Sequence, residues 1–419
     1  MFFTGLSEPN EGEKWKNHNI MCLVGNGFDI GALLRINKDH GIRHTGFGPN
    51  VLSKYEDFYR YLQFSTIVSS NNTIYRKMQE KEIEAAAHDK SWSNFEGIVD
   101  ELVFGDDWDE SRSDAEKLSE INEIEKSLRE MQYAFSSFLY KLLPSEKLQK
   151  FDEIVRDKNF AIGSLQGFMK DVAKADGENL NIGFPTKVNP NDHLNFLFVD
   201  FNYTMLLDSY INLDRQSFNV KQYKSSDNNF FFFPDPNQAI SSIEKADYVS
   251  SKSWWAHRPI RNTQILTHVV HPHGIQDAPG SILFGTEDYR NIEDARWKFL
   301  KNLWARDSEK YKKDFEKTNL FIIFGMSVSF TDGWWMTEIY RRLLTGAELI
   351  IYNFNKELGE TSAQVKERFK DACIYLSPEE NSDFDRIQNK IYIVDHNGQN
   401  NCFLGFNGVS EPITINPEF

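Results

Sequence analysis

The side chains best suited to chemistry in this sequence follow short apolar runs. His271 and His273, separated by Pro272, come directly after the run Ile265–Val270. The ordinary pKa of imidazole lies near neutrality, so His273, which precedes Gly274, is a candidate general base. Two histidines two residues apart also have a spacing that metal sites use, but the proline and the lack of a carboxylate nearby in sequence argue against one. No metal is expected.

A glycine pair follows another apolar run. The segment Gly25-Asn-Gly-Phe-Asp29 comes directly after Ile20–Val24. Glycines let backbone N–H groups approach an anion closely, and a helix that begins there adds a favourable dipole. An ordinary turn at the end of a strand explains the same residues. Asp29 would repel phosphate and is better suited to accept ribose hydroxyls or to cap a helix.

Two further loops carry hydrogen-bonding side chains. Asn202 and Tyr203 follow the run Leu194–Val199, where an asparagine in isolation is typical of a turn. The segment Gly325-Met-Ser-Val-Ser-Phe-Thr-Asp332 follows Leu320–Phe324 and offers hydroxyl groups to an anion. It lacks the Gly-x-Ser-x-Gly pattern of α/β-hydrolases, and the chain has no Walker A loop. Both absences argue against those two enzyme classes.

These loops share one position, at the ends of predicted strands. Continuous apolar runs of four to six residues are typical of strands buried on both faces of a sheet. The runs are Ile20–Val24, Leu194–Val199, Ile265–Val270, Leu320–Phe324, Leu349–Tyr352 and Ile391–Val394. Residues 113–143, 332–344 and 362–369 have helical spacing, so the pattern predicts an α/β fold: a Rossmann-like, mostly parallel sheet with helices on both faces. Ligands of such sheets bind outside the carboxyl ends of the strands.

Two segments interrupt the strand pattern. Residues 64–192 contain no comparable run, which predicts a helical insertion or lid, and the core is then formed by residues 1–63 and 193–419. Glu96 lies in this insertion and is either a weak site candidate or an ordinary surface charge. Residues from about 212 to 262 are polar and irregular, so a mobile loop and a second insertion are both open.

Composition limits the classes of function. The 419 residues include 47 Lys and Arg against 62 Asp and Glu, a net charge of −15, which argues against neutralisation of a nucleic acid. The apolar share of 40% suffices for a large core and excludes global disorder. Cys22, Cys373 and Cys402 lie too far apart for a paired-cysteine zinc module. Residues 1–19 lack an apolar signal core and no window suits a membrane helix, so we expect a cytoplasmic protein.

Taken in chain order, the motifs resemble a known family. They are Leu23-Val-Gly-Asn-Gly-Phe-Asp29, Trp92-Ser-Asn-Phe-Glu96, Phe201-Asn-Tyr-Thr204, His271-Pro-His-Gly274 and Ile323-Phe-Gly-Met-Ser-Val-Ser-Phe-Thr-Asp332. This order resembles the AbiH family of bacteriophage abortive-infection proteins. It is also similar to the sirtuin-like fold of defence enzymes that hydrolyse NAD. The resemblance implies an antiviral role in which NAD, as substrate, is cleaved to nicotinamide and ADP-ribose.

The resemblance also implies roles for individual residues. Asn202 would hold the attacking water or the ribose, and His273 would act as the base. The implied NAD-binding residues are Gly25, Asn26, Gly27, Phe28, Asp29, Tyr203, Gly325, Ser327, Asp332 and Asn353. The chain departs from sirtuin-like proteins at Asn26, where those have a small apolar residue, and at Asp29, which replaces a serine-type residue. The missing zinc module weakens protein deacetylation and favours nucleotide cleavage.

Three functions remain open at this stage. They are NAD hydrolysis, nucleotide sensing by a binding module without turnover, and metal-dependent hydrolase or nuclease activity using His271 and His273. The expected partners are a small-molecule nucleotide and a phage-derived trigger or partner defence protein, without a membrane or a nucleic acid. The aromatic-rich composition is compatible with a homo-oligomer. In so acidic a chain, we expect backbone amides and helix ends to hold a phosphate more than side-chain cations do.

Overall fold

The structure is a computed structural model in which part of the chain is described. The described residues are 17–40, 51–87, 95–105, 108, 111–157, 160, 164, 167–168, 171, 193–212, 264–286, 294–354, 359–397 and 402–406. Trp92, Ser93 and Asn94 of the motif Trp92-Ser-Asn-Phe-Glu96 lie outside them. So does nearly all of the irregular segment predicted at about 212–262.

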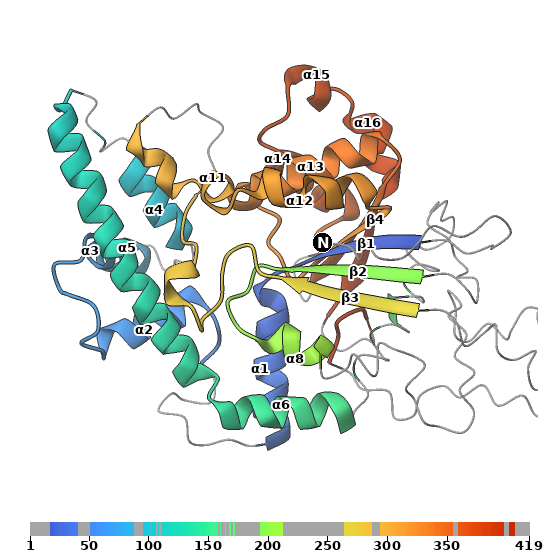
Figure 1. Cartoon of the computed structure of the whole chain (residues 1–419), viewed down its shortest axis with the longest axis horizontal. Helices are drawn as coiled ribbons and strands as arrows, with labels where there is room; N and C mark the ends of the chain where they lie inside the picture. Colours follow the sequence, from blue (N-terminus) through green and yellow to red (C-terminus); the bar gives the residue numbers. More distant parts are fainter. Residues whose placement is uncertain are drawn as a thin grey trace, which may run out of the picture.

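A six-stranded parallel sheet forms the centre of the molecule (Figure 1). Its strands are β1 (Asn17–Val24), β2 (His193–Asp200), β3 (Gln264–Val270), β4 (Leu320–Phe324), β5 (Glu348–Phe354) and β6 (Ile391–His396). The spatial order is β3-β2-β1-β4-β5-β6, and every neighbouring pair is parallel. This order confirms the predicted Rossmann-like α/β fold, and all six apolar runs are strands. The direction of winding reverses between β1 and β4, which is where such sheets bind ligands.

The apolar runs are continuous because both faces of the sheet are covered. In β1, Ile20, Cys22 and Val24 belong to one hydrophobic core, while Met21 and Leu23 belong to the other. Successive side chains of a strand point to opposite faces, so a strand between two cores needs apolar residues at every position. Alternating polar residues would place a polar group in one of the two cores.

Helices cover both faces of the sheet (Figure 1). They are α1 (Asn26–His40), α2 (Tyr55–Gln63), α3 (Thr73–Ala87), α4 (Phe95–Phe104), α5 (Asp114–Leu142), α6 (Ser145–Asp157), α8 (Leu206–Asn212), α11 (Lys301–Ala305), α12 (Asp307–Lys317), α13 (Gly333–Leu344), α14 (Ser362–Ala372), α15 (Pro378–Asn381) and α16 (Phe384–Ile387). Short 3₁₀ turns are η3 (Pro279–Ser281), η4 (Ala295–Phe299), η5 (Phe330–Asp332) and η6 (Gln388–Lys390). Figure 1 places α1, α6 and α8 on one face and α12, α13 and α14 on the other. Among these helices, none is long and apolar enough to cross a membrane.

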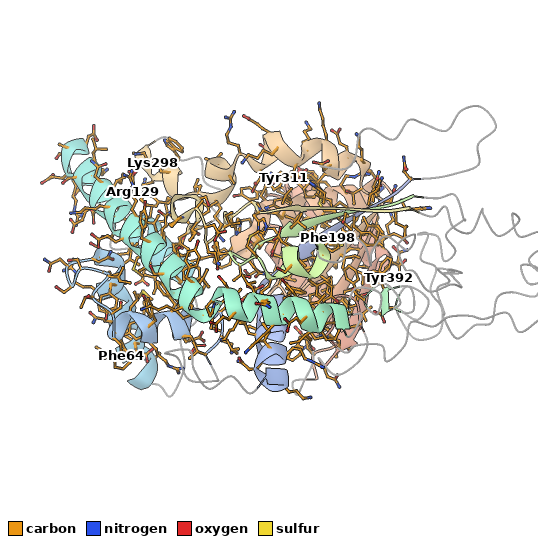
Figure 2. The ribbon with its side chains drawn as sticks, turned by 60° about the horizontal axis from the view of Figure 1, so that its bottom comes forward. Phe64, Arg129, Phe198, Lys298, Tyr311 and Tyr392 are labelled. Atoms are coloured by element: carbon orange, nitrogen blue, oxygen red, sulfur yellow. The ribbon has the colours of Figure 1, made fainter. Side chains whose placement is uncertain are left out.

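The described residues between α2 and α6 form helices joined by turns, without a strand, and the longest helix is α5. Ser113 and Glu116 form a capping box that starts this helix. In the first half of the helix, Glu125 forms an ion pair with Lys298 at 3.1 Å, and Figure 2 shows Lys298 near Arg129 of the same helix. Toward the other end, Ser136 donates a hydrogen bond to the carbonyl of Gln276 at 2.8 Å. The helical segment therefore packs directly on the loops after β3. Its assignment as a separate subdomain over residues 64–192 stays a prediction.

His396 closes the carboxyl end of β6 and is almost fully buried. Its ring stacks on Phe324, with centroids 5.4 Å apart and planes at 20°. Neither ring nitrogen has a hydrogen-bond partner among the described residues. Burial lowers the pKa of His396 to about 4, against the opposing effect of the Asp395 carboxylate. The imidazole is therefore a neutral stacking surface at the edge of the sheet.

Replacing this ring with a non-titrating one should change the acid stability of the protein. The unfolded histidine, with a pKa near 6.5, binds protons more readily than the folded one, so His396 stabilises the fold above about pH 6.5 and loses this contribution as the pH falls toward 4. We expect the loss to reach about 2 kcal/mol at pH 5. In His396→Phe this component should be absent, and the free energy of unfolding between pH 7 and pH 5 should fall less steeply than in the wild type. Parallel pH curves for the two proteins would contradict the assignment.

Candidate functional site

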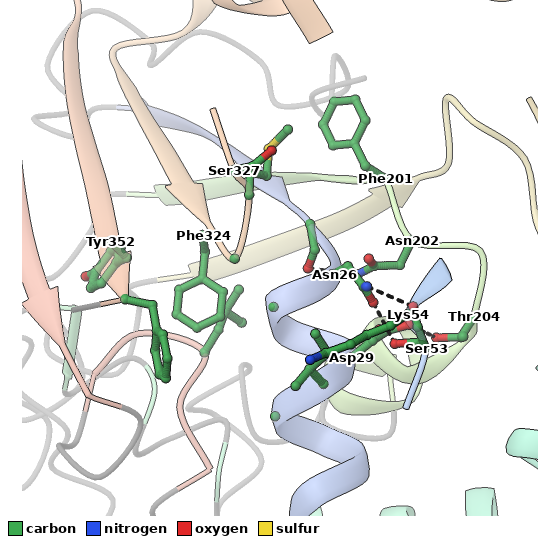
Figure 3. A pocket seen from close by; sticks show the side chains of 18 of the residues that line it. Asn26, Asp29, Ser53, Lys54, Phe201, Asn202, Thr204, Phe324, Ser327 and Tyr352 are labelled. Carbon is green, nitrogen blue, oxygen red and sulfur yellow. Dashed lines mark hydrogen bonds between the residues drawn. The ribbon is translucent and has the colours of Figure 1, made fainter. Parts of the chain in front are cut away.

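A cavity of about 840 Å³ opens at the carboxyl edge of the sheet, and we refer to it as the switch-point cavity (Figure 3). Residues after β1, β2, β4, β5 and β6 line it, together with side chains from α5. The strands end level with one another: Val24 pairs with both Asp200 and Phe324, and Val199 pairs with Val270. This register brings loops that are far apart in sequence to one place.

The cavity gathers eleven of the twelve site residues that the sequence predicts. The exception is Phe28, whose side chain is fully buried and packs edge-on against Tyr210 with ring centroids 5.4 Å apart. Because helix α1 begins at Asn26, Phe28 lies on the side of its first turn that faces the core. Its side chain does not line the cavity, and its contact with a nucleotide stays a prediction.

The two glycine loops form the floor of the cavity by packing against each other. Gly27 donates a hydrogen bond to the carbonyl of Gly325 at 2.8 Å, and Gly25 donates to the carbonyl of Phe324 at 2.9 Å. A Cβ on Gly27 would lie 2.6 Å from the Cα of Gly325, whose own φ of +67° favours glycine. The glycines thus allow close backbone approach, and these two N–H groups are already occupied. The predicted phosphate contact through them stays a prediction.

Asn26 links two segments at the rim of the cavity by hydrogen bonds. Its side-chain amide donates to the carbonyl of Ser53 at 2.8 Å and accepts from the Ser53 hydroxyl at 2.6 Å (Figure 3). This pair of bonds holds the loop before α2 against the start of α1. Asn26 is exposed, so its position at the mouth of the cavity depends on these bonds more than on packing.

Asn202 is buried at the end of β2 and is oriented from two sides. Its backbone N–H donates to the Asp200 carboxylate at 3.0 Å, which is the turn role that asparagines often have after a strand. Its side-chain nitrogen donates to the carbonyl of Gly25 at 3.2 Å. The amide therefore lines the cavity with its nitrogen fixed by the β1 loop. The turn role and a role in binding are compatible at this position.

His273 faces the same space from the end of β3. It is buried, its ring contacts Phe201 edge-on, and its Nε2 lies 3.9 Å from Oδ1 of Asp332. Burial lowers the pKa of His273 well below its usual value, and the nearby Lys301 cation lowers it further. The imidazole is therefore neutral near pH 7, which is the form that can accept a proton.

A buried ion pair in the cavity wall was not predicted. Nζ of Lys301 lies 2.6 Å from the Glu96 carboxylate and 3.8 Å from Oδ1 of Asp332. Burial alone would lower the pKa of Lys301, but these two carboxylates raise it above its usual value. Burial raises the pKa of Glu96 and of Asp332, and the Lys301 cation limits both shifts. Oδ1 of Asp332 has no hydrogen-bond partner within the described part of the chain, so it is available to a donor from a ligand.

The remaining predicted residues differ in their surroundings. Tyr203 donates to the carbonyl of Leu283 at 3.2 Å, and its pKa is raised by burial and by the nearby Glu96 carboxylate. Ser327 is exposed in the β4 loop. Asn353, at the end of β5, donates to the Asp395 carboxylate at 2.8 Å. Tyr203 and Asn353 are therefore both buried in the wall, whereas Ser327 is open to solvent.

The cavity is basic within an acidic protein. Its lining includes five basic side chains and three acidic ones. The basic residues are Arg35, Lys38, Lys54, Lys301 and Arg368, and the acidic residues are Asp29, Glu96 and Asp332. Arg35 and Lys38 lie three residues apart on α1, hence on one face of that helix, and Figure 3 shows Lys54 beside the start of α1. The expectation that backbone groups hold a phosphate more than side-chain cations do stays a prediction, and the lining offers cations as well.

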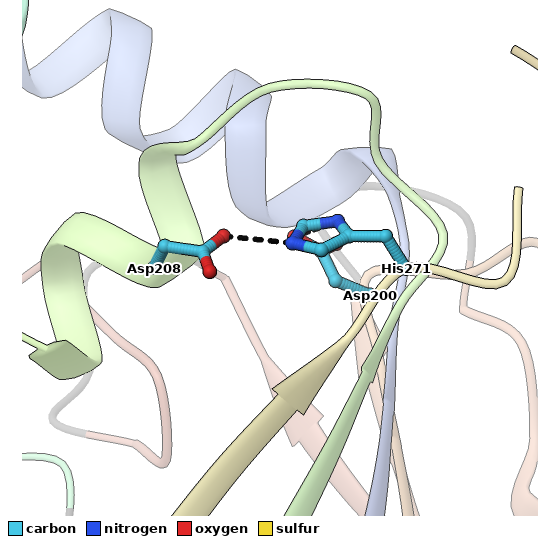
Figure 4. Close-up of side chains that lie close together, drawn as sticks. All are labelled: Asp200, Asp208 and His271. Atoms are coloured by element: carbon cyan, nitrogen blue, oxygen red, sulfur yellow. Dashed lines mark hydrogen bonds and ion pairs between the residues drawn. The ribbon is translucent and has the colours of Figure 1, made fainter. Parts of the chain in front are cut away.

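The two histidines of the His271-Pro-His273 motif diverge. Whereas His273 lines the cavity, Nε2 of His271 is hydrogen-bonded to Asp208 at 2.9 Å, and its Nδ1 lies 3.8 Å from Asp200 (Figure 4). Asp29 lies next to this group and accepts a hydrogen bond from Thr204 at 2.7 Å. Burial raises the pKa of Asp29 to about 7, with Thr204 and His271 opposing the shift. A joint site of His271 and His273, the basis of the metal-dependent hydrolase hypothesis, is not formed.

Comparison with known protein families gives a match to one family over most of the chain. A family model described as bacteriophage abortive infection AbiH matches residues 21–354. The matched segment begins in β1 and ends with β5, so it includes the loops after β1 to β4 that line the switch-point cavity. No curated protein matches the chain significantly.

The contact between the glycine loops can be tested with a matched pair of variants. In Gly27→Ala the new methyl group would meet backbone at 2.6 Å, so we expect a loss of about 1–3 kcal/mol in the free energy of unfolding, which outweighs the better helix propensity of alanine. Gly280→Ala is the control, because a Cβ there has nothing within 4 Å. Urea denaturation should separate the two variants. Equal stability of Gly27→Ala and the wild type would show that the loops separate at little cost.

Because Lys301 and Glu96 form an ion pair, we expect substitutions of the two residues to have non-additive effects on the free energy of unfolding. Lys301→Met leaves the Glu96 and Asp332 carboxylates buried without their cation, and we expect a loss of about 3–5 kcal/mol in stability. The double variant Glu96→Gln with Lys301→Met should recover part of that loss, because one uncompensated charge is removed. Unfolding free energies of the single and double variants give the coupling directly. Additive losses would mean that the two side chains do not interact.

Proposed function

The chain belongs to the AbiH family of bacteriophage abortive-infection proteins, and from this premise we propose that it hydrolyses NAD to nicotinamide and ADP-ribose. The observation that carries the proposal is that Asn202 and His273, which come from different strands, line one cavity at the point where the sheet reverses its winding. Dinucleotides bind at this position in sheets of the same strand order. The cavity volume of about 840 Å³ lies within the range of cofactor sites.

The charges along the cavity suit the two ends of such a ligand. The basic side chains of Arg35, Lys38 and Lys54 favour a pyrophosphate at the α1 side of the opening. At the other side, Oδ1 of Asp332 is buried without a hydrogen-bond partner among the described residues and would accept a ribose hydroxyl. A nucleotide that spans the cavity would thus supply the partner that this oxygen lacks.

The bond to be broken joins nicotinamide to C1′ of its ribose. Nicotinamide leaves as a neutral molecule with the bonding electrons, positive charge develops on the ribose, and a water oxygen bonds to C1′. Asn202 positions that water or the ribose, and neutral His273 accepts the proton that the water loses. General-base catalysis of this kind contributes typically about 10²–10⁴ to the rate.

The buried carboxylates have an electrostatic role in this scheme. Glu96 and Asp332 lie on either side of Lys301, so at their ordinary charges the three groups together carry a net negative charge. A preorganised negative charge stabilises an oxocarbenium-like transition state more than it stabilises the bound substrate. The buried Lys301 cation lowers the pKa of both carboxyl groups against the effect of burial and so favours their ionised form.

Incubation of the purified protein with NAD tests the proposal. We expect release of nicotinamide and ADP-ribose, with the rate reduced at least about 100-fold in Asn202→Ala and in His273→Ala. Asn381→Ala on the exposed helix α15 serves as the matched control and should keep the wild-type rate. Phage lysate is added in a parallel reaction, since a defence enzyme can depend on a trigger.

The outcomes of these assays distinguish NAD hydrolysis from nucleotide sensing without turnover. Undiminished cleavage in both cavity variants would remove Asn202 and His273 from the mechanism. Saturable NAD binding without turnover, in the presence and absence of lysate, would instead favour a nucleotide sensor. Binding is measured by calorimetry with the same four proteins, so that a loss of affinity is distinguished from a loss of turnover.

A further inference from the structure

A second polar cluster lies at the same edge of the sheet, behind the wall of the switch-point cavity. It consists of Asp200 at the end of β2, Asp208 on α8 and His271 after β3, which we call the Asp–His cluster (Figure 4). None of the three lines the cavity. We propose that the Asp–His cluster binds one divalent transition-metal ion.

The geometry of the cluster is close to that of a metal site. One candidate ligand atom from each of the three residues lies within 4.8 Å of the other two. Ligands that share one ion, each at about 2.1 Å from it, lie roughly 3–4 Å apart. Nδ1 of His271 lies 3.8 Å from Oδ2 of Asp200, and Nε2 lies 2.9 Å from Oδ2 of Asp208. Because an imidazole offers a single nitrogen to a given ion, one of the two carboxylates would turn toward the nitrogen that binds.

Unsatisfied atoms point to a missing partner. Asp200 is completely buried, and its Oδ2 accepts no hydrogen bond from any described residue; Nδ1 of His271 likewise has none. Burying a carboxylate oxygen without a hydrogen-bond partner destabilises the fold. In the described part of the chain, no lysine or arginine forms an ion pair with Asp200 or Asp208, and Asp29 adds a third carboxylate nearby. A bound cation would satisfy both the open lone pairs and the excess negative charge.

The donor set selects the class of ion. Imidazole favours zinc among the divalent metals, whereas carboxylates accept both zinc and manganese. A set of two carboxylates and one histidine therefore suits Zn²⁺ or Mn²⁺ better than Mg²⁺ or Ca²⁺, which prefer oxygen ligands alone.

Such an ion would also fix the two residues proposed for NAD cleavage, a consequence that rests on the proposed function. Asp200 precedes Asn202 by two residues and accepts its backbone N–H, and His271 precedes His273 by two residues. An ion that joins the ends of β2 and β3 would hold both catalytic candidates at a constant separation. The ion itself takes no part in the bond change.

The test uses the full-length protein after removal of metals with EDTA and dialysis. Titration with Mn²⁺ or Zn²⁺ in a calorimeter should show one ion bound per chain, and saturation should raise the thermal unfolding temperature, with Mg²⁺ weaker by at least about 10-fold. Asp200→Asn and His271→Gln should weaken binding by about 100-fold or more. His273→Gln is the control, because it changes the neighbouring histidine of the motif and should keep wild-type affinity for the ion.

The variants are also compared in EDTA, so that misfolding is recognised. Asp200→Asn without metal should unfold at or above the wild-type temperature, because it removes a buried carboxylate whose Oδ2 has no hydrogen-bond partner among the described residues and keeps an oxygen for the Asn202 N–H. Absence of saturable Mn²⁺ and Zn²⁺ binding in the wild type would overturn the proposal, as would equal binding by folded Asp200→Asn and His271→Gln. The readout is metal affinity, so failure of the NAD assay would leave this result unchanged.

Discussion

The close contact between the loops after β1 and β4 is the constraint on which the rest of the site depends. At Gly27 the two backbones approach so closely that no side chain fits between them, and hydrogen bonds from Gly25 and Gly27 hold them together. These strands are neighbours across the reversal point of the sheet, so the contact sets the floor of the cavity. It also fixes the carbonyl of Gly25, which in turn orients the amide of Asn202. A larger residue at Gly27 would therefore disturb both the packing of the sheet edge and the position of a side chain on the next strand.

Charge is distributed unevenly around this contact. The chain carries a net charge of −15, yet basic side chains outnumber acidic ones in the lining of the cavity. Lys301 is the only lining cation that is fully buried among the described residues, and its ion pair with Glu96 reaches across from α11 to α4. An anionic ligand would meet a local field opposite in sign to that of the whole molecule. The same wall offers carboxylate oxygens, so it can hold both a phosphate and a sugar.

Much of the fold follows from the sequence, because strands buried on both faces leave continuous apolar runs. All six runs became strands, and the loops after them carry eleven of the twelve predicted site residues into one cavity. The sequence does not show that Phe28 faces the core while its neighbours face the cavity. In the first turn of a helix, the direction of each side chain depends on tertiary packing. Lys301 was missed because it follows no strand, and Glu96 was ambiguous because its partner lies more than 200 residues away. Asp200 and His271 could have been found as the polar residues at the ends of paired strands; Asp208 could not, since a helix brings it there.

Three buried carboxylate oxygens at this edge, from Asp29, Asp200 and Asp332, share one physical problem. Within the described residues none of them accepts a hydrogen bond, and burial raises the pKa of all three groups. Protonation of the carboxylate would remove the buried charge. An asparagine in its place would have no charge at any pH, so no proton would have to be taken up. A fold under selection for stability alone gains nothing from retaining three such acids. Their presence is explained if each oxygen meets a partner from outside the chain: a hydroxyl of the ligand at Asp332 and Asp29, which line the cavity, and a cation at Asp200, which lies behind it. The two proposals thus account for one common feature of the sheet edge, although each depends on its own measurement.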